Sequence, residues 1–396
     1  MIQSVAVSMV GVLPAFLVGA LAVQLRSDLH IGLAGIGLAT AFLFTVSSSL
    51  ARLSGAFVQR IGSRRGIVLS ASLSAAALVG AGTAQSYLML VMALLVGGVG
   101  NAMAQPAANL GLSQFVPEGR LGLTFGIKQS SIPAATFFGG LAVPGIALVV
   151  GWRWVWVVAA TMALTVACWA AFTKRDEVTR ERNRGGEIDK GLPPSGLLVL
   201  TIGGGLATAA STTVGVFLVD SGVDAGLQPG DAGLVFALAS LLGLGVRIGL
   251  GWAADNYPKR SLYVLIANLL AGGAGGYFLL SLGNPAAFMV GACLAYGAGW
   301  AWTGLFHFAI VKDNRRAAAS ATGFVQTGLS LGAACGPLSF GLLAEATSYR
   351  SAWLATAGLS LLAALVIRTG RRMVRRSRGL PVVSVRGRLP SGVFGD

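Results

Sequence analysis

The stretch Lys174-Arg-Asp-Glu-Val-Thr-Arg-Glu-Arg-Asn-Arg-Gly-Gly-Glu-Ile-Asp-Lys-Gly-Leu-Pro-Pro194 is the only long charged interruption in a chain that is otherwise almost wholly apolar. Six hydrophobic segments of membrane-spanning length precede it, and six follow it. We therefore expect four parts: an N-terminal half of six helices (1–173), a central loop (174–195), a C-terminal half of six helices (196–368) and a basic, disordered tail (369–396).

The composition excludes a water-soluble body. Hydrophobic residues make up 55% of the chain and charged residues 11%, against roughly 25% charged residues in soluble domains. A bilayer core about 30 Å thick requires about 20 apolar residues per helix, and runs of this length without strict alternation indicate helices. We predict an all-α membrane protein with twelve transmembrane helices, at about 3–24, 32–56, 66–84, 87–113, 121–148, 153–173, 196–219, 229–254, 261–281, 286–311, 317–343 and 351–368.

The net charge of +15 would suggest nucleic acid as a partner of a soluble protein, but in a membrane protein Lys and Arg set the topology. They fall in alternate loops, and the opposite loops hold only Arg26, Arg153 and Arg350. This bias predicts a multi-pass protein of the bacterial cytoplasmic membrane, with both termini and the central loop in the cytoplasm. The arginines from Arg368 onward either anchor the last helix or bind anionic lipid.

The two halves repeat each other. Gly126-Ile-Lys-Gln129 aligns with Gly323-Phe-Val-Gln326, and Trp152-Arg-Trp-Val-Trp156 aligns with Tyr349-Arg-Ser-Ala-Trp353, both at an offset of 197 residues. Because each half has an even number of spans, both halves insert the same way up. Such parallel repeats predict two pseudo-symmetric halves with a solute path between them near the bilayer midplane.

The segment Arg247-Ile-Gly-Leu-Gly251-Trp-Ala-Ala-Asp255-Asn-Tyr-Pro-Lys259-Arg260 resembles the G-x-x-x-D-x-x-G-R-R signature of the major facilitator superfamily. Its counterpart after the second span is Arg52-Leu-Ser-Gly55-Ala-Phe-Val-Gln59-Arg60-Ile-Gly62-Ser-Arg64-Arg65. The resemblance, together with the twelve spans, covers essentially the entire chain. It implies the fold of that superfamily and a transporter that works by alternating access.

In that family the acidic residue of the signature loop faces a helix N-terminus and local arginines, and this network latches the outward-facing state. The resemblance assigns this role to Asp255 with Arg247 as its partner, whereas Gln59 replaces the acid in the first half. The glycines let helices approach closely. The alternative is that the charges only set topology. The expected gating residues are Arg52, Gly55, Arg60, Arg64, Arg65, Arg247, Gly251, Asp255, Lys259 and Arg260.

Polar side chains follow single helical faces in several spans. They either bind solute or join helices by hydrogen bonds of about 1 kcal/mol each. The candidate solute-binding residues are Lys128, Asn101, Gln105, Trp300, Thr303, His307 and Gln326.

Lys128 lies seven residues inside the fifth span, and charges within spans are rare enough to suggest function. We expect Gln105 at a similar depth on the fourth span and no carboxylate at comparable depth anywhere, so Lys128 favours an anionic solute. The alternative is snorkelling to the interface. His307, four residues from the cytoplasmic end of the tenth span, either couples protons or is simply packed there.

The glycine-rich runs, such as Gly203-Gly-Gly205, Gly245-x-x-x-Gly249, Gly272-x-x-x-Gly276 and Gly332-x-x-x-Gly336, lie within apolar helices and predict close helix packing rather than a phosphate loop. Only two histidines are present, and no nucleophile, base and orienting residue are grouped. We therefore expect no enzyme, no cofactor, no metal and no nucleic-acid partner, but a monomer in the lipid bilayer.

The predicted function is secondary active or facilitative transport of a small solute, with an organic anion as the favoured class. One alternative is a proton-coupled exporter of hydrophobic compounds, with Trp300 and Trp302 as the contact surface. Another is a transport-inactive membrane sensor or scaffold.

Overall fold

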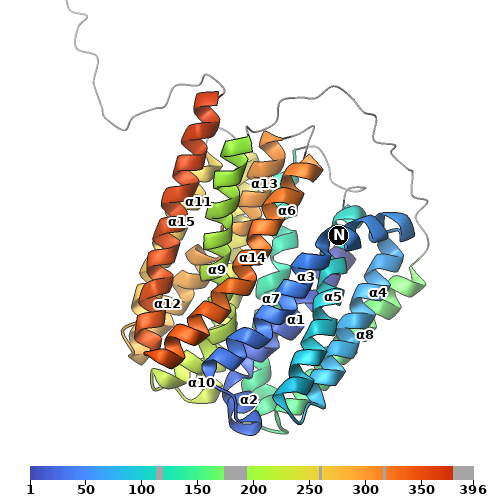
Figure 1. Cartoon of the computed structure of the whole chain (residues 1–396), viewed down its shortest axis with the longest axis vertical. Coiled ribbons are helices and arrows are strands. Elements are labelled where there is room, and N and C mark those ends of the chain that lie inside the picture. The colour runs from blue at the N-terminus through green and yellow to red at the C-terminus, as the bar shows by residue number, and fades with distance from the viewer. Residues whose placement is uncertain (113–118, 174–193, 258–260, 315–317, 378–396) are drawn as a thin grey trace, which may run out of the picture.

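The computed structural model describes residues 1–112, 119–173, 194–257, 261–314 and 318–377, and this part of the chain is helical without strands (Figure 1). Eleven helices among these residues are long and apolar enough to cross a membrane. The predicted all-α membrane fold is confirmed, and the count of twelve spans stays a prediction.

The helices of the two halves follow the predicted segments closely. The first half comprises α1 (Ile2–Ala20), α2 (Ala22–Leu29), α3 (Leu33–Ile61), α4 (Ser63–Gly82), α5 (Tyr87–Leu112), α6 (Leu121–Gln129), α7 (Ser131–Ala142), the π-helical turn η1 (Val143–Ala147) and α8 (Trp152–Phe172). The second comprises α9 (Pro194–Asp224), α10 (Pro229–Asn256), α11 (Leu262–Leu280), α12 (Pro285–Leu294), the π-helical turn η2 (Ala295–Gly299), α13 (Thr303–Asp313), α14 (Ala318–Ala346) and α15 (Tyr349–Ser377).

Two ends of the bundle serve as reference. We call the end with the N-terminus and the last turns of α15 the termini face, and the end with α2 and the start of α10 the far face (Figure 1).

The predicted tenth span, 286–311, is present as three pieces, α12, η2 and α13, none of which alone reaches membrane-spanning length. The interruption falls on Gly297 and Gly299, because glycine weakens a regular α-helix. Single π-helical turns of this kind often accompany functional sites. The break places the backbone of Trp300 in the middle of the bundle.

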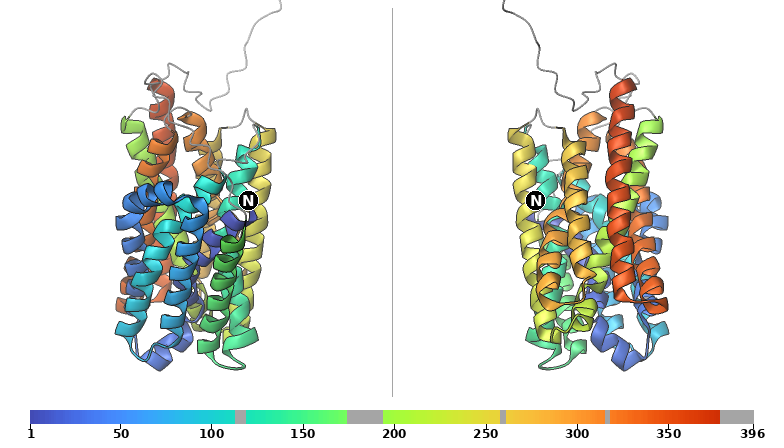
Figure 2. Two further views of the ribbon diagram at one scale, coloured as in Figure 1. Left: turned by 90° about the vertical axis from the view of Figure 1, so that its right-hand side faces the viewer. Right: turned by 90° about the vertical axis from the view of Figure 1, so that its left-hand side faces the viewer.

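The last helix is longer than predicted. We expected a span ending near 368 and a disordered tail, but α15 continues to Ser377 and extends beyond its neighbours at the termini face (Figure 2). Arginine is a good helix former, and no proline or glycine follows Gly370 until Gly379, so the helix has no reason to end earlier. Residues 378–396 lie outside the described part.

The signature segments are also helical rather than looped. Residues 52–61 form the last turns of α3, and 247–256 form the last turns of α10. Asp255 therefore projects from a helix end whose orientation is set by the whole of α10.

The halves meet through α3 and α14 in an uneven way. At the far face the two helices touch, since a Cβ atom added at Gly37 would lie 2.4 Å from the carbonyl oxygen of Pro337. Towards the termini face, a Cβ atom added at Gly55 or at Gly323 would meet nothing within 4 Å. The close glycine contact between the two helices thus lies at the far face, and neither of these two glycines near the termini face makes one.

Close packing of small residues holds helices together, as expected where lipid leaves little hydrophobic driving force. Gly332 of α14 abuts the backbone of Gly205 of α9, and Gly276 of α11 abuts that of Gly291 of α12. For Gly245 and Gly249 the prediction is wrong, since added Cβ atoms there would meet open space.

Candidate solute site and contacts between the halves

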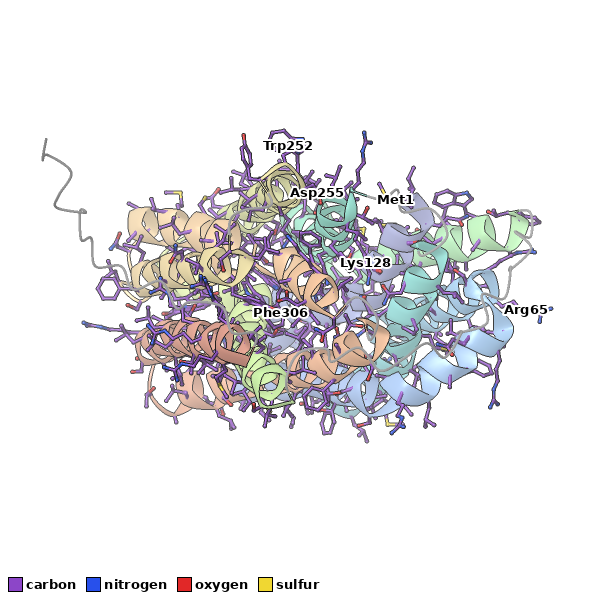
Figure 3. The ribbon with its side chains drawn as sticks, turned by 90° about the horizontal axis from the view of Figure 1, so that it is seen from above. Met1, Arg65, Lys128, Trp252, Asp255 and Phe306 are labelled. Carbon is purple, nitrogen blue, oxygen red and sulfur yellow. The ribbon has the colours of Figure 1, made fainter. Side chains whose placement is uncertain are left out.

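Lys128 lies in the last turn of α6 and is only 5% exposed. Its Nζ donates to Oδ1 of Asn109 on α5. Seen from the termini face, Lys128 lies within the outline of the bundle, whereas Arg65 and Trp252 lie at its margin (Figure 3). This partner is neutral, and Gln105, expected at a similar depth, is half-buried four residues earlier on α5.

Ion pairs among the described residues lie elsewhere. The two that are present, Arg26 with Asp220 and Arg153 with Asp28, both belong to the far face. A buried ammonium without a carboxylate partner is costly unless it is compensated. Among the residues that the structure describes, Lys128 therefore has no carboxylate partner for its positive charge.

Arg247 of α10 is a second buried cation, 2% exposed. Its guanidinium donates to the carbonyl oxygen of Gln129 and, at 2.8 Å, to that of Trp300. Pro133 has no N–H to bind the carbonyl of Gln129 four residues earlier, and Trp300 lies at the break between η2 and α13. Arg247 thus satisfies carbonyls at two helix irregularities, and the predicted pairing of Arg247 with Asp255 is wrong.

His307 of α13 contacts Gln129, the residue after Lys128, and so joins both halves. Its Nδ1 is 3.1 Å from Nε2 of Gln129 and 2.8 Å from the carbonyl oxygen of Thr303. Its Nε2 is 3.3 Å from Oε1 of Gln326 on α14. The structure therefore brings Lys128, His307 and Gln326 together in one polar cluster.

The remaining candidate residues are placed differently. Asn101 is buried and donates to Oγ of Ser47 on α3, 3.0 Å away, while Gln105 is half-buried on the same face of α5. Thr303 enters the cluster through its backbone carbonyl, because its hydroxyl has no hydrogen-bond partner in the described part. Asn101 thus binds within the first half rather than at the lysine.

The tryptophans are structural. Trp300 packs edge-on against Phe16 of α1 at 5.5 Å between ring centroids. Trp302 is fully buried and donates from Nε1 to Oγ of Ser211 on α9, 3.2 Å away. Neither ring is exposed in this structure, so the contact surface of Trp300 and Trp302 stays a prediction.

Asp255 confirms the expected contact with a helix N-terminus. Its two carboxylate oxygens accept from the backbone amides of Gly122 and Leu123, at the start of α6, both at 2.8 Å. A carboxylate is stabilised there by the unpaired amides and the helix dipole. Gly251 permits this approach, because a Cβ atom added there would lie 2.5 Å from the carbonyl oxygen of Gly122.

The first-half signature makes weaker contacts. Gly55 faces open space, so its expected close approach is wrong in this structure. Arg64 donates from Nε to the carbonyl of Ala170 at 3.0 Å and also to that of Ala171, within its own half. Arg52, Arg60 and Arg65 are exposed. Lys259 and Arg260 lie outside the described residues.

The far face holds contacts that sequence reasoning missed. Arg26 of α2 pairs with Asp220 of α9 at 2.7 Å, and Tyr349 also donates to Asp220, which is only 4% exposed. Glu345 of α14 accepts from the amide of Ala34 at the start of α3, at 2.8 Å. Asp220 lies near the end of α9 yet is buried, and its pairing with a residue of the other half could not be read from the sequence.

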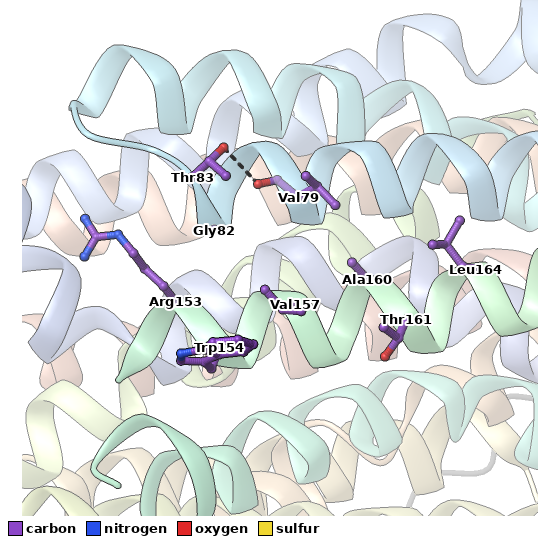
Figure 4. Close-up of a pocket in the computed structure, with 9 residues that line it drawn as sticks. All are labelled: Val79, Gly82, Thr83, Arg153, Trp154, Val157, Ala160, Thr161 and Leu164. Carbon is purple, nitrogen blue, oxygen red and sulfur yellow. Dashed lines mark hydrogen bonds between the residues drawn. The ribbon is translucent and has the colours of Figure 1, made fainter. Parts of the chain in front are cut away.

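A groove of about 220 Å³ lies between α4 and α8, away from this cluster (Figure 4). Its lining is apolar apart from Thr83, Thr161 and Arg153, and Arg153 lies at one end of the groove (Figure 4). Exposed Trp154 and Leu164 border it on the outer surface of the first half, where lipid chains are the expected neighbours.

The comparisons with known proteins agree on one family. The model of the Major Facilitator Superfamily matches residues 4–319. An uncharacterized MFS-type transporter, MT3072, of Mycobacterium tuberculosis is 26% identical over 361 residues, which cover 82% of this chain and 76% of the relative.

Solved structures share the fold at low identity. A bacterial homolog of the human lysosomal transporter Spinster, inward-facing and unoccupied, matches with a TM-score of 0.73 at 15% identity, over 95% of this chain and 97% of that one. The human organic anion transporter MFSD10 (TETRAN) matches with a TM-score of 0.66, also at 15% identity, over 92% and 99%. With its helical bundle, its signature helix α10 and a family match over most of its length, the chain belongs to the major facilitator superfamily.

Proposed function

We propose that this transporter moves a small organic anion by alternating access between its two halves, with Lys128 as the anion-binding group. The observation that carries the proposal is the burial of Lys128 against a neutral partner, Asn109. Arg247 of the second half adds another buried cation, and its partners are the neutral backbone carbonyls of Gln129 and Trp300. A solute carboxylate would supply the missing counter-charge.

The energetic scale supports selection by charge. Two unit charges 4 Å apart attract by roughly 4 kcal/mol at an effective dielectric constant of about 20. This exceeds the differences of about 1 to 3 kcal/mol that apolar shape alone provides in discrimination. The description of one protein of similar fold as an organic anion transporter is compatible with this class.

The access route follows from the uneven packing of α3 and α14. We infer that the termini face is cytoplasmic and that the solute enters or leaves there between these helices, while the far face is closed. The positive-inside bias supports this orientation, since Arg60, Arg64 and Arg65 lie at the termini face.

The test is uptake into liposomes that contain the purified protein. Small carboxylates, neutral compounds and organic cations of matched size are compared at equal external concentration. The proposal requires saturable uptake of at least one carboxylate and none of its amide analogue. Uptake of hydrophobic cations or neutral drugs in place of carboxylates would instead favour the exporter alternative.

A further inference from the structure

We propose that His307 binds a proton that travels with the anion, which makes the transporter a proton–anion symporter. This inference rests on the proposed function, since it concerns the same cluster. The observation behind it is that Nδ1 of His307 faces Nε2 of Gln129 at 3.1 Å and the carbonyl oxygen of Thr303 at 2.8 Å. An imidazole nitrogen either accepts or donates, so it cannot bind both partners in one protonation state.

In the neutral ring, Nδ1 accepts from Gln129 and Nε2–H donates to Oε1 of Gln326 at 3.3 Å. The amide of Gln326 is oriented for this by its own bond to Oγ of Ser330. The opposite neutral tautomer would leave a bare Nε2 facing the oxygen of Gln326. The neutral ring therefore bridges the first half, through Gln129, to the second.

In the protonated ring both nitrogens donate. Nδ1–H then binds the carbonyl of Thr303, within α13, while Nε2–H keeps Gln326. Gln129 loses its acceptor, so binding one proton from solvent exchanges a hydrogen bond between the halves for one inside the second half.

The charges around the ring link this proton to the anion. The helices packed against α13 include α6, α10, α11 and α14. Two of these helices contribute cations near Gln129, which binds the ring: Lys128 precedes Gln129 on α6, and Arg247 of α10 donates to the carbonyl of Gln129. Nearby positive charge disfavours an imidazolium, and a bound anion would offset that charge.

Among the described residues, the carboxylates on these helices are bound elsewhere or lie at the far face, as Asp231 does at the start of α10. Asp255 of α10 is bound to the amides that begin α6. Tyr263 of α11 donates to Asp313, at the termini end of α13, and Glu345 of α14 lies at the far face. The counter-charge that admits the proton is therefore the solute, and by linkage the proton strengthens anion binding by the same factor.

The experiment measures the affinity of the reconstituted protein for the transported carboxylate between about pH 8 and about pH 5.5, a range that spans histidine titration. We expect wild-type affinity to rise on acidification by between about 5-fold and about 150-fold, the usual range of such couplings. In His307→Asn, whose side chain cannot take up a proton, the ratio of the two affinities should fall to about one. The matched control is His30→Asn, at the only other histidine, and it should keep the wild-type ratio.

A second variant guards against loss of folding in the first. Gln129→Leu removes the donor that favours the neutral ring, so the midpoint of the pH dependence should move to higher pH. An unchanged affinity ratio in His307→Asn, or an unmoved midpoint in Gln129→Leu, would overturn the proton assignment. A wild-type protein that transports no carboxylate at any pH would instead remove the proposed function itself.

Discussion

Pro133 explains the position of Arg247. The proline lacks the N–H that would bind the carbonyl of Gln129, and the guanidinium of Arg247 takes that carbonyl across the interface between the halves. The break at Trp300 supplies a second carbonyl at 2.8 Å. Arg247, which the signature motif paired with Asp255, thus donates hydrogen bonds to backbone carbonyls in the centre of the bundle.

This account predicts an energetic coupling between Pro133 and Arg247. Pro133→Ala restores an amide that can bind the carbonyl of Gln129, so Arg247→Met should reduce the Tm of the detergent-solubilised protein less in that background than in the wild type. The expected interaction energy is about 1 to 2 kcal/mol, typical of contacting groups. Equal losses of Tm in both backgrounds would show that Arg247 does not act through that carbonyl.

At the scale of helices, the described residues include, on each face of the bundle, a carboxylate that caps a helix of the other half. Asp255 of α10 caps α6 at the termini face, and Glu345 of α14 caps α3 at the far face. Each cap contributes roughly 0.3 to 2 kcal/mol, the range measured for charges at helix ends. In the proposed alternating access, caps between the halves break or re-form as the halves move.

For Asp255 we expect Asp255→Asn to slow transport several-fold while insertion and solute binding persist, because the amide keeps one acceptor but loses the charge. Initial uptake rates and equilibrium binding, measured on the same reconstituted protein, separate these effects. Asp231→Asn, an exposed acid at the other end of α10, is the control. A wild-type uptake rate in Asp255→Asn would show that the carboxylate only helps to set the topology.

For Glu345 the expected effect is on the far face. Glu345→Gln weakens the contact with Ala34, so the population that is open at this face should grow. The probe is a cysteine at Leu33, which is buried where α3 meets α14. It is introduced into protein whose Cys168, Cys293 and Cys335 are replaced by alanine. In the purified protein this cysteine should then react several-fold faster with a thiol reagent. Unchanged reactivity relative to Asp231→Asn in the same background would mean that Glu345 does not hold the far face closed.

Hydropathy predicted most helix boundaries to within a few residues, because lipid requires continuous apolar helices. It could not predict the break within 285–313, since glycine in an apolar run also occurs in straight helices. Nor could it predict the pairing of Arg26 with Asp220 or of Ala34 with Glu345. These partners lie 194 and 311 residues apart, and their contact depends on how the two halves pack.

At the scale of the whole molecule, the orientation in the membrane remains a prediction with a direct test. Asn284, exposed at the far face before α12, is replaced by cysteine in one variant, and Thr179, outside the described residues, in another. An impermeant thiol reagent added to intact cells should label Asn284→Cys and should label Thr179→Cys only after permeabilisation. The reverse pattern would invert the topology.

The central claim is that the charge of Lys128 selects an anion, and the most direct test is carboxylate uptake by Lys128→Gln in liposomes. Loss of an attraction of roughly 4 kcal/mol predicts a fall in uptake of at least about 100-fold. Lys128→Arg, which keeps the charge, should retain part of the uptake, and Lys312→Gln, at the end of α13, should retain all of it. Wild-type carboxylate uptake by Lys128→Gln would contradict the account.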